Sequence, residues 1–245
     1  MVEYTKIKTG NGLLQEIKMT IANWIILGFI IITTGLLIFS YIKKNSLMKK
    51  ICECILIPLF ATLNVLVLKE SLPDSLHLIK VTLFSLSMVS ISTIFLSFEN
   101  YKPLRIAGRI LVVASIICWI SLYRTIFFIH KVPLWLTILM TSIYIAGTII
   151  AIVLSGKQEL RFYVLFAISF ALTAYLHFCS LIFLCFETAG YSIMLFAGTS
   201  IFAGLTAFHF INQTKLKTKH AGVIRYGLLV ISQVLIACSN ILLIR

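Results

Sequence analysis

The sequence has 245 residues, of which 60% are hydrophobic and only 12% are charged. Soluble domains carry about 25% charged residues, so this composition excludes an ordinary soluble protein and leaves no room for a separate soluble domain. The net charge of +13 would raise the question of nucleic-acid binding in a soluble chain. Here the distribution of the basic residues along the chain leads to a different interpretation.

Long apolar runs occupy most of the chain. A helix needs roughly 20 mainly apolar residues to cross a hydrocarbon core about 30 Å thick. Strands of a membrane barrel would instead be about 10 residues of alternating pattern, so these continuous runs predict helices. The sequence therefore predicts an all-α, polytopic bundle of eight transmembrane helices that forms a single integral membrane domain over residues 1–245. The predicted spans are residues 22–42, 51–68, 81–98, 106–122, 134–154, 162–186, 191–211 and 223–244.

The segments between the spans differ in charge on the two predicted sides. One side holds thirteen basic and three acidic residues, whereas the other side, with both termini, holds eight basic and five acidic residues. The positive-inside rule makes the first side cytoplasmic. Its basic loops should attract anionic lipid head groups, which accounts for the net charge without nucleic acid. We expect a multi-pass protein of a bacterial inner membrane whose partners are membrane lipids. The sequence indicates no oligomeric state.

The spans also recur at a regular distance. Spans five to eight lie about 112 to 119 residues after spans one to four, as expected for two parallel four-helix repeats related by an axis along the membrane normal. Equal helix and loop lengths would produce the same spacing without a repeat.

Small polar residues gather in the third and seventh spans, which include Ser85 and Thr206. Such residues usually allow helices to approach closely, and in a carrier they would line a path for the substrate. Asn64 in the second span and Gln233 in the eighth are less common in a membrane. An amide that faces lipid leaves its donors and acceptors unsatisfied, so both side chains should face the bundle interior.

Ionisable residues are rare within the spans. His177 lies about 15 Å inside the sixth span from its outer end. It is either a proton relay or a neutral histidine bonded to a serine or carbonyl group of a neighbouring helix. Glu187 lies in the turn after this span. Its carboxyl group is either an acid or an interfacial carboxylate that pairs with Arg124. The chain has no H-E-x-x-H, Walker or EF-hand pattern, and we expect no metal and no cofactor.

Three short patterns appear in order along the chain. Residues 55–61 read I-L-I-P-L-F-A, residues 84–86 read F-S-L, and residues 232–236 read S-Q-V-L-I. With eight spans, the chain resembles the lysoplasmalogenase, or YhhN-like, family. That family has K-P-L-L-M-P-L-L-A in its second helix, F-S-L-L-G-D in its third, an S-D pair in its seventh and A-Q-x-L-I in its last. The sequence departs from these motifs where the family Lys-Pro falls on Glu53-Cys54, Gly-Asp on Met88-Val89, and the seventh-helix Asp on or near Thr206.

The resemblance implies hydrolysis of the vinyl ether bond of lysoplasmalogens, which releases a fatty aldehyde and a glycerophospho-alcohol. This chemistry needs a proton donor. Because the family acids are missing, His177 and Glu187 are the candidate catalytic residues, and Asn64, Ser85, Thr206 and Gln233 are candidates to line the substrate site. Two alternatives stay open, namely a carrier for a small or lipid-like solute and a noncatalytic membrane subunit.

Overall fold

The computed structural model describes residues 21–71, 76–98, 101–123, 132–155, 160–186, 190–214 and 221–242. The described residues form eight helices and no strands, and each helix is long and apolar enough to span a membrane. The prediction of an all-α bundle of eight transmembrane helices is therefore confirmed. The helices are α1 (Ile21–Ile42), α2 (Ser46–Ser71), α3 (Leu76–Ser97), α4 (Lys102–Tyr123), α6 (Leu134–Ser155), α7 (Leu160–Phe186), α8 (Gly190–Thr214) and α9 (Ala221–Leu242).

All helix boundaries lie within five residues of the predicted ones, and α2 shows why some predicted spans were too short. The turn between α1 and α2 closes tightly, because Lys44 adopts a positive φ of 55° and the Asn45 amide donates to the Ser40 carbonyl oxygen at 2.9 Å. This is the Schellman ending of a helix. Asn45 then caps α2, since its Oδ1 accepts from the Met48 amide at 3.1 Å. The helix thus begins five residues before the predicted span.

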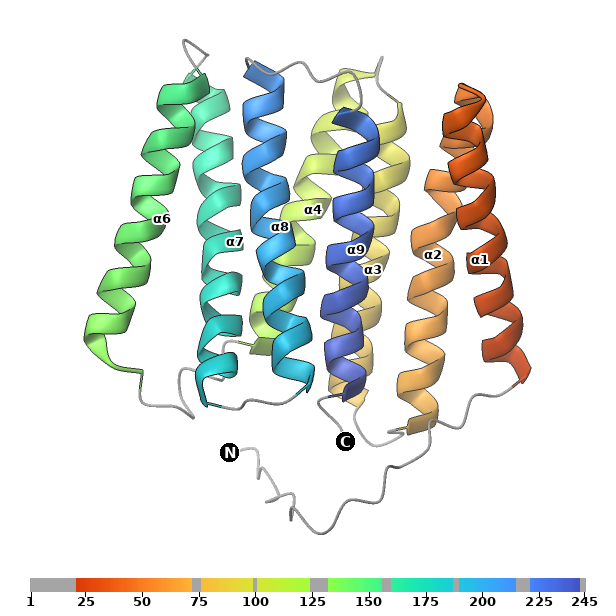
Figure 1. Cartoon of the computed structure of the whole chain (residues 1–245), viewed down its shortest axis with the longest axis horizontal. Helices are drawn as coiled ribbons and strands as arrows, with labels where there is room; N and C mark the ends of the chain where they lie inside the picture. The colour runs from red at the N-terminus through yellow and green to blue at the C-terminus, as the bar shows by residue number, and fades with distance from the viewer. Residues whose placement is uncertain are drawn as a thin grey trace.

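The helices stand side by side and alternate in direction, so that α1 and α6 run the same way at opposite edges of the bundle (Figure 1). We call the end at which α1 ends and α2 begins the basic end. The first four helices contact the last four through α4 with α7, α2 with α9, and α3 with α9. If α1–α4 are superposed on α6–α9 in order, the α4–α7 contact is the counterpart of the α2–α9 contact. The two parallel repeats stay a prediction.

A central apolar core is shared by helices from both halves, while the outside of the bundle carries many exposed large hydrophobic side chains. Lipid tails can cover such a surface, as they do around membrane helices. Two glycines allow close packing inside. A Cβ on Gly108 would lie 2.9 Å from Leu96 Cγ on α3, and one on Gly198 would lie 2.9 Å from Leu235 Cβ on α9. These approaches hold α3 against α4 and α8 against α9.

Candidate functional site

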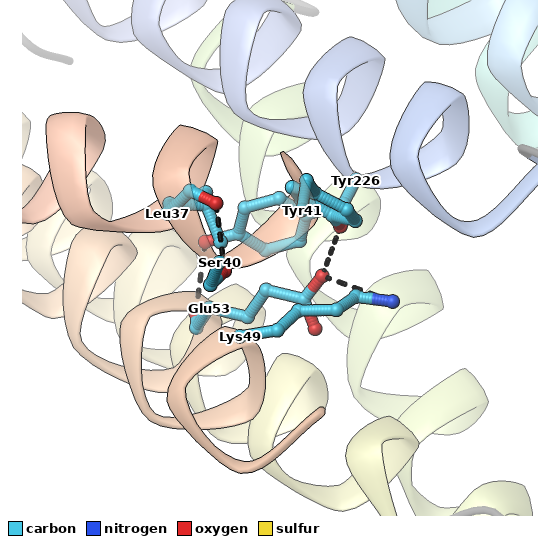
Figure 2. Close-up of polar contacts among 6 residues, drawn as sticks. All are labelled: Leu37, Ser40, Tyr41, Lys49, Glu53 and Tyr226. Atoms are coloured by element: carbon cyan, nitrogen blue, oxygen red, sulfur yellow. Dashed lines mark hydrogen bonds and ion pairs between the residues drawn. The ribbon is translucent and has the colours of Figure 1, made fainter. Parts of the chain in front are cut away.

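Among the residues that the structure describes, Glu53 of α2 has a carboxylate side chain that lies within the helical bundle. It lies seven residues after the start of α2, which is about 10 Å along the helix. Its side chain is 15% exposed. Tyr41 of α1 donates a hydrogen bond to Glu53 Oε1 at 2.5 Å, and Lys49 Nζ lies 3.9 Å from the same oxygen (Figure 2). The carboxylate therefore has a hydroxyl donor and a cation on the same oxygen atom.

The surroundings of Glu53 join three helices. Tyr226 of α9 donates to the backbone carbonyl oxygen of Glu53 at 2.8 Å, from the side opposite the carboxylate (Figure 2). Lys49 Nζ lies 4.8 Å from the centre of the Tyr41 ring, close enough for a cation–π contact. We call Tyr41, Lys49, Glu53 and Tyr226 the Glu53 group. These contacts hold its side chains in a single arrangement at the basic end.

Further basic side chains lie beside this group. Arg225 of α9 interacts electrostatically with Tyr41, and Arg109 of α4 interacts with Arg105 and Arg225. His209 of α8 lies within electrostatic range of both Arg109 and Arg225. Arg109 and Arg225 are only half-exposed. Four helices, α2, α4, α8 and α9, thus bring basic side chains to one end of the bundle, where the structure describes a single carboxylate side chain.

Glu53 is one of the three acidic residues assigned above to the basic side, and it is not among the predicted site residues. The reason was the late start given to the second span, which left Glu53 near the end of the helix. Asn45 was the available signal, because asparagine directly before a helical pattern is a common N-cap. An N-cap at Asn45 would have extended the helix and placed Glu53 two turns inside it.

His177 occupies a different part of the bundle. It is half-buried on α7, and its Nδ1 lies 3.2 Å from the Thr199 hydroxyl of α8. The same hydroxyl lies 2.6 Å from Ser180 Oγ. The imidazole stacks on Phe196 with ring centres 4.9 Å apart and meets Tyr144 edge-on. A hydroxyl partner on the neighbouring helix is the kind of bond expected for a neutral histidine, and a role as a proton relay stays a prediction.

The two amides predicted to face the interior are both buried, at 1% exposure each. Gln233 Oε1 accepts from Trp119 Nε1 at 3.1 Å, which ties α9 to α4. Its Nε2 has no hydrogen-bond partner among the described residues, and neither side-chain atom of Asn64 has one. Ser115 Oγ on α4 is also buried without a partner there. The expected inward orientation is correct, but these polar atoms are only partly satisfied.

A second polar network joins α3, α4 and α9 near the end opposite the basic end. It was not predicted from the sequence. Tyr123 of α4 donates to Asn240 Oδ1 and lies 3.2 Å from Ser239 Oγ. Asn240 Nδ2 donates to Thr82 Oγ1 of α3 at 3.2 Å. All four residues are buried. Tyr123 and Asn240 stand close to helix ends, where the sequence gives no indication that they turn inward, so only the packing reveals this network.

The remaining predicted residues have local roles or cannot be placed. Ser85 is buried and donates to the Ser115 carbonyl oxygen at 3.1 Å, so it joins α3 to α4. Thr206 donates to the Phe202 carbonyl oxygen one turn earlier in its own helix, at 3.0 Å. Glu187 lies outside the described residues. That the predicted residues form one site stays a prediction.

A groove of about 550 Å³ lies on the face formed by α3 and α4, and His177 is not among its lining residues. Its walls are Lys80, Val81, Leu83, Phe84, Ser87, Cys118 and Ser121. Within the part of the chain that the structure describes, no three His, Cys, Asp or Glu side chains are grouped as metal ligands. Comparisons of the chain with protein-family models, curated proteins and solved structures gave no match.

Proposed function

We propose that this chain is a membrane-embedded hydrolase that cleaves the vinyl ether bond of lysoplasmalogens, with Glu53 as the proton donor. The observation that supports this most is the position of the Glu53 carboxyl group, which is 15% exposed and held by Tyr41 within the helices. The resemblance to lysoplasmalogenases requires an acid inside the bundle. Glu53 stands where the lysine of the family's second-helix motif falls, so the proposal assigns the acid to a new position.

The depth of Glu53 suits this substrate. The 26 residues of α2 extend over about 39 Å, close to the 40–45 Å of a bilayer with its head groups. Glu53, about 10 Å from the start of the helix, is then near the boundary between head groups and hydrocarbon. The vinyl ether bond of a lysoplasmalogen joins the glycerol unit to the alkenyl chain and lies at this same boundary. A lipid entering from the side would bring the bond to the depth of the carboxyl group.

The chemistry can be written with this one acid. Before turnover the Glu53 carboxylate, which Tyr41 and Lys49 contact, takes up a proton from solvent. It transfers this proton to the vinyl carbon that is not bonded to oxygen, which leaves an oxocarbenium ion and the carboxylate. Water adds to the cationic carbon, and the carboxylate takes a proton from that water. The resulting hemiacetal breaks its bond between carbon and glycerol oxygen, giving a fatty aldehyde and a glycerophospho-alcohol. One water is consumed, and Glu53 ends protonated, as it began. A positioned acid contributes roughly 10²- to 10⁴-fold to such a step.

Aldehyde release tests the proposal. Purified protein in neutral detergent is incubated with a lysoplasmalogen. The Glu53→Gln variant and a matched control, Lys50→Gln, three residues earlier in α2, are assayed in parallel. Lys50 is exposed, so its variant should keep the activity. The Glu53→Gln variant should lose about 100-fold or more. Absence of aldehyde above a protein-free blank would end the hydrolase proposal.

Variants of the sequence-predicted acids belong in the same assay. Unchanged rates in His177→Ala and Glu187→Gln would exclude both residues as the proton donor. Loss of activity in one of them, with Glu53→Gln still active, would move the acid away from Glu53 while leaving the reaction class in place.

A carrier is the second candidate, and the partly satisfied amides favour it. Asn64 on α2 and Gln233 on α9 are buried, and α2 contacts α9 across the two halves of the bundle. Binding sites of carriers built from repeats lie at such an interface. Uptake of a solute into proteoliposomes that is lost in Asn64→Leu and Gln233→Leu would support this function. A protein with neither activity would be a noncatalytic membrane subunit.

A further inference from the structure

Among the residues that the structure describes, the arginines beside the Glu53 group have no acidic partner. The ion pair formed by the described residues is Lys49 with Glu53, and neither Arg109 nor Arg225 takes part in one. Arg109 interacts electrostatically with Arg105 and with Arg225, and both interactions are between like charges. Repulsion of this kind grows as charges leave bulk water, and both arginines are only half-exposed. An anion bound between them would relieve it.

The third cation near this position is held in place. Lys49 is fixed by Glu53 at 3.9 Å and by the Tyr41 ring at 4.8 Å. Its Nζ also lies 3.8 Å from the position of a Cβ on Gly222, at the start of α9. Arg225 lies three residues after Gly222 on the same helix and interacts with Tyr41. Lys49 and Arg225 therefore stand on the two sides of the contact between α2 and α9.

All three cations lie within the first two turns of their helices at the basic end, and Lys49 is three residues from the start of α2, about 4–5 Å along it. Arg109 is seven residues from the start of α4 and Arg225 is four residues from the start of α9, which gives depths of about 10 Å and 6 Å below the helix ends. Lipid phosphates occupy the layer just above the hydrocarbon core. Guanidinium groups bind phosphate with paired hydrogen bonds, and basic pockets between transmembrane helices bind lipid head groups.

We propose that Lys49, Arg109 and Arg225 bind the phosphate group of a membrane lipid at the basic end of the bundle. This inference rests on the proposed function in naming a single-chain phospholipid as the ligand, since a phosphate held here would bring the glycerol of the same lipid to Glu53. The site itself needs no catalysis. Inorganic phosphate shares the chemistry of the ligand, so the experiment must separate the two sources.

The test measures binding of a saturated 1-alkyl lysophospholipid, which has no vinyl ether bond and is not hydrolysed. Native mass spectrometry of the purified protein in neutral detergent gives the affinity. Arg109→Gln and Arg225→Gln should each weaken binding about tenfold or more, because each removes a charged hydrogen bond to the phosphate. Arg109→Lys should retain part of the affinity. Lys50 is exposed and is not one of the three proposed ligands, so Lys50→Gln should retain all of it.

Two probes identify the source of the anion. A monoacylglycerol without phosphate should bind at least about tenfold more weakly than the lysophospholipid. Equal binding of the monoacylglycerol would overturn the proposal, as would unchanged affinity in both glutamine variants with native helix content. Inorganic phosphate that binds as tightly as the lipid would overturn the lipid assignment. Arginine-dependent binding without aldehyde release would refute the hydrolase alone, and aldehyde release with arginine-independent binding would refute this inference alone.

Discussion

Trp119 donates from Nε1 to Oε1 of Gln233 at 3.1 Å, across 114 positions of sequence, and this bond joins α4 of the first half to α9 of the second. Both side chains are buried. In a bilayer no water is available to replace a lost partner, so the bond should be coupled strongly to the stability of the bundle.

The first prediction concerns this bond. Trp119→Phe should lower the free energy of unfolding by about 1–3 kcal/mol more than its lost packing explains, since it leaves the Gln233 carbonyl oxygen unsatisfied. Gln233→Leu in the Trp119→Phe background should recover part of that loss. Unfolding by SDS in mixed micelles measures all four proteins of the double-mutant cycle. Additive effects of the two substitutions would contradict the coupling.

The Asn64 side chain gives a prediction of opposite sign. Both of its polar atoms are buried without a partner among the described residues, so replacement by leucine removes an unsatisfied group of similar size. Asn64→Leu should be neutral or stabilise the protein by about 1–3 kcal/mol in the same unfolding assay. Asn64→Ala serves as the control, because it removes the amide and leaves a void. A clear loss in Asn64→Leu would mean that a bound water or solute satisfies the amide in the native protein.

Close packing between α8 and α9 depends on Gly198. A Cβ there would lie 2.9 Å from Leu235 Cβ and 3.0 Å from the Ile236 backbone nitrogen, neither of which can turn away. Gly198→Ala should therefore destabilise the protein by about 1–3 kcal/mol through overpacking. Gly204 of the same helix has no atom within 4 Å of its Cβ position, so Gly204→Ala should be neutral or stabilising. Equal unfolding midpoints for the two variants would disprove the packing argument.

The turn between α1 and α2 carries strain at Lys44, whose φ is 55°. A left-handed backbone costs roughly 1–2 kcal/mol for a residue with a Cβ, and glycine adopts it freely. Lys44→Gly should raise the free energy of unfolding by up to about 1 kcal/mol, the remainder being offset by the larger freedom of glycine in the unfolded chain. Lys43→Gly, one residue earlier and with no positive φ, should not be stabilising. A stabilisation shared by both variants would point to lost charge repulsion instead of backbone strain.

The eight membrane-spanning helices could be predicted from the amino-acid sequence alone, because each span depends on about 20 neighbouring residues that must all tolerate lipid. The same local reasoning oriented Asn64 and Gln233 inward, since an amide has nowhere else to find a partner. It failed at Glu53, where one turn of helix decided whether the carboxylate belongs to a loop or to the bundle. Asn45 would have corrected the boundary, but no local pattern announces the pairing with Tyr41.

Which polar side chains contact one another could not be predicted without the packed bundle. Each of the three polar networks includes a hydrogen bond between the two halves of the bundle. These bonds are Tyr226 to Glu53, Trp119 to Gln233, and Tyr123 to Asn240. Such contacts depend on how each helix is rotated about its axis and which neighbour it packs against. In lipid, apolar faces on opposite sides of a helix are equally well solvated, so hydrophobicity does not fix this rotation. Packing at positions such as Gly108 and Gly198 does, and it is set by residues far apart in the sequence.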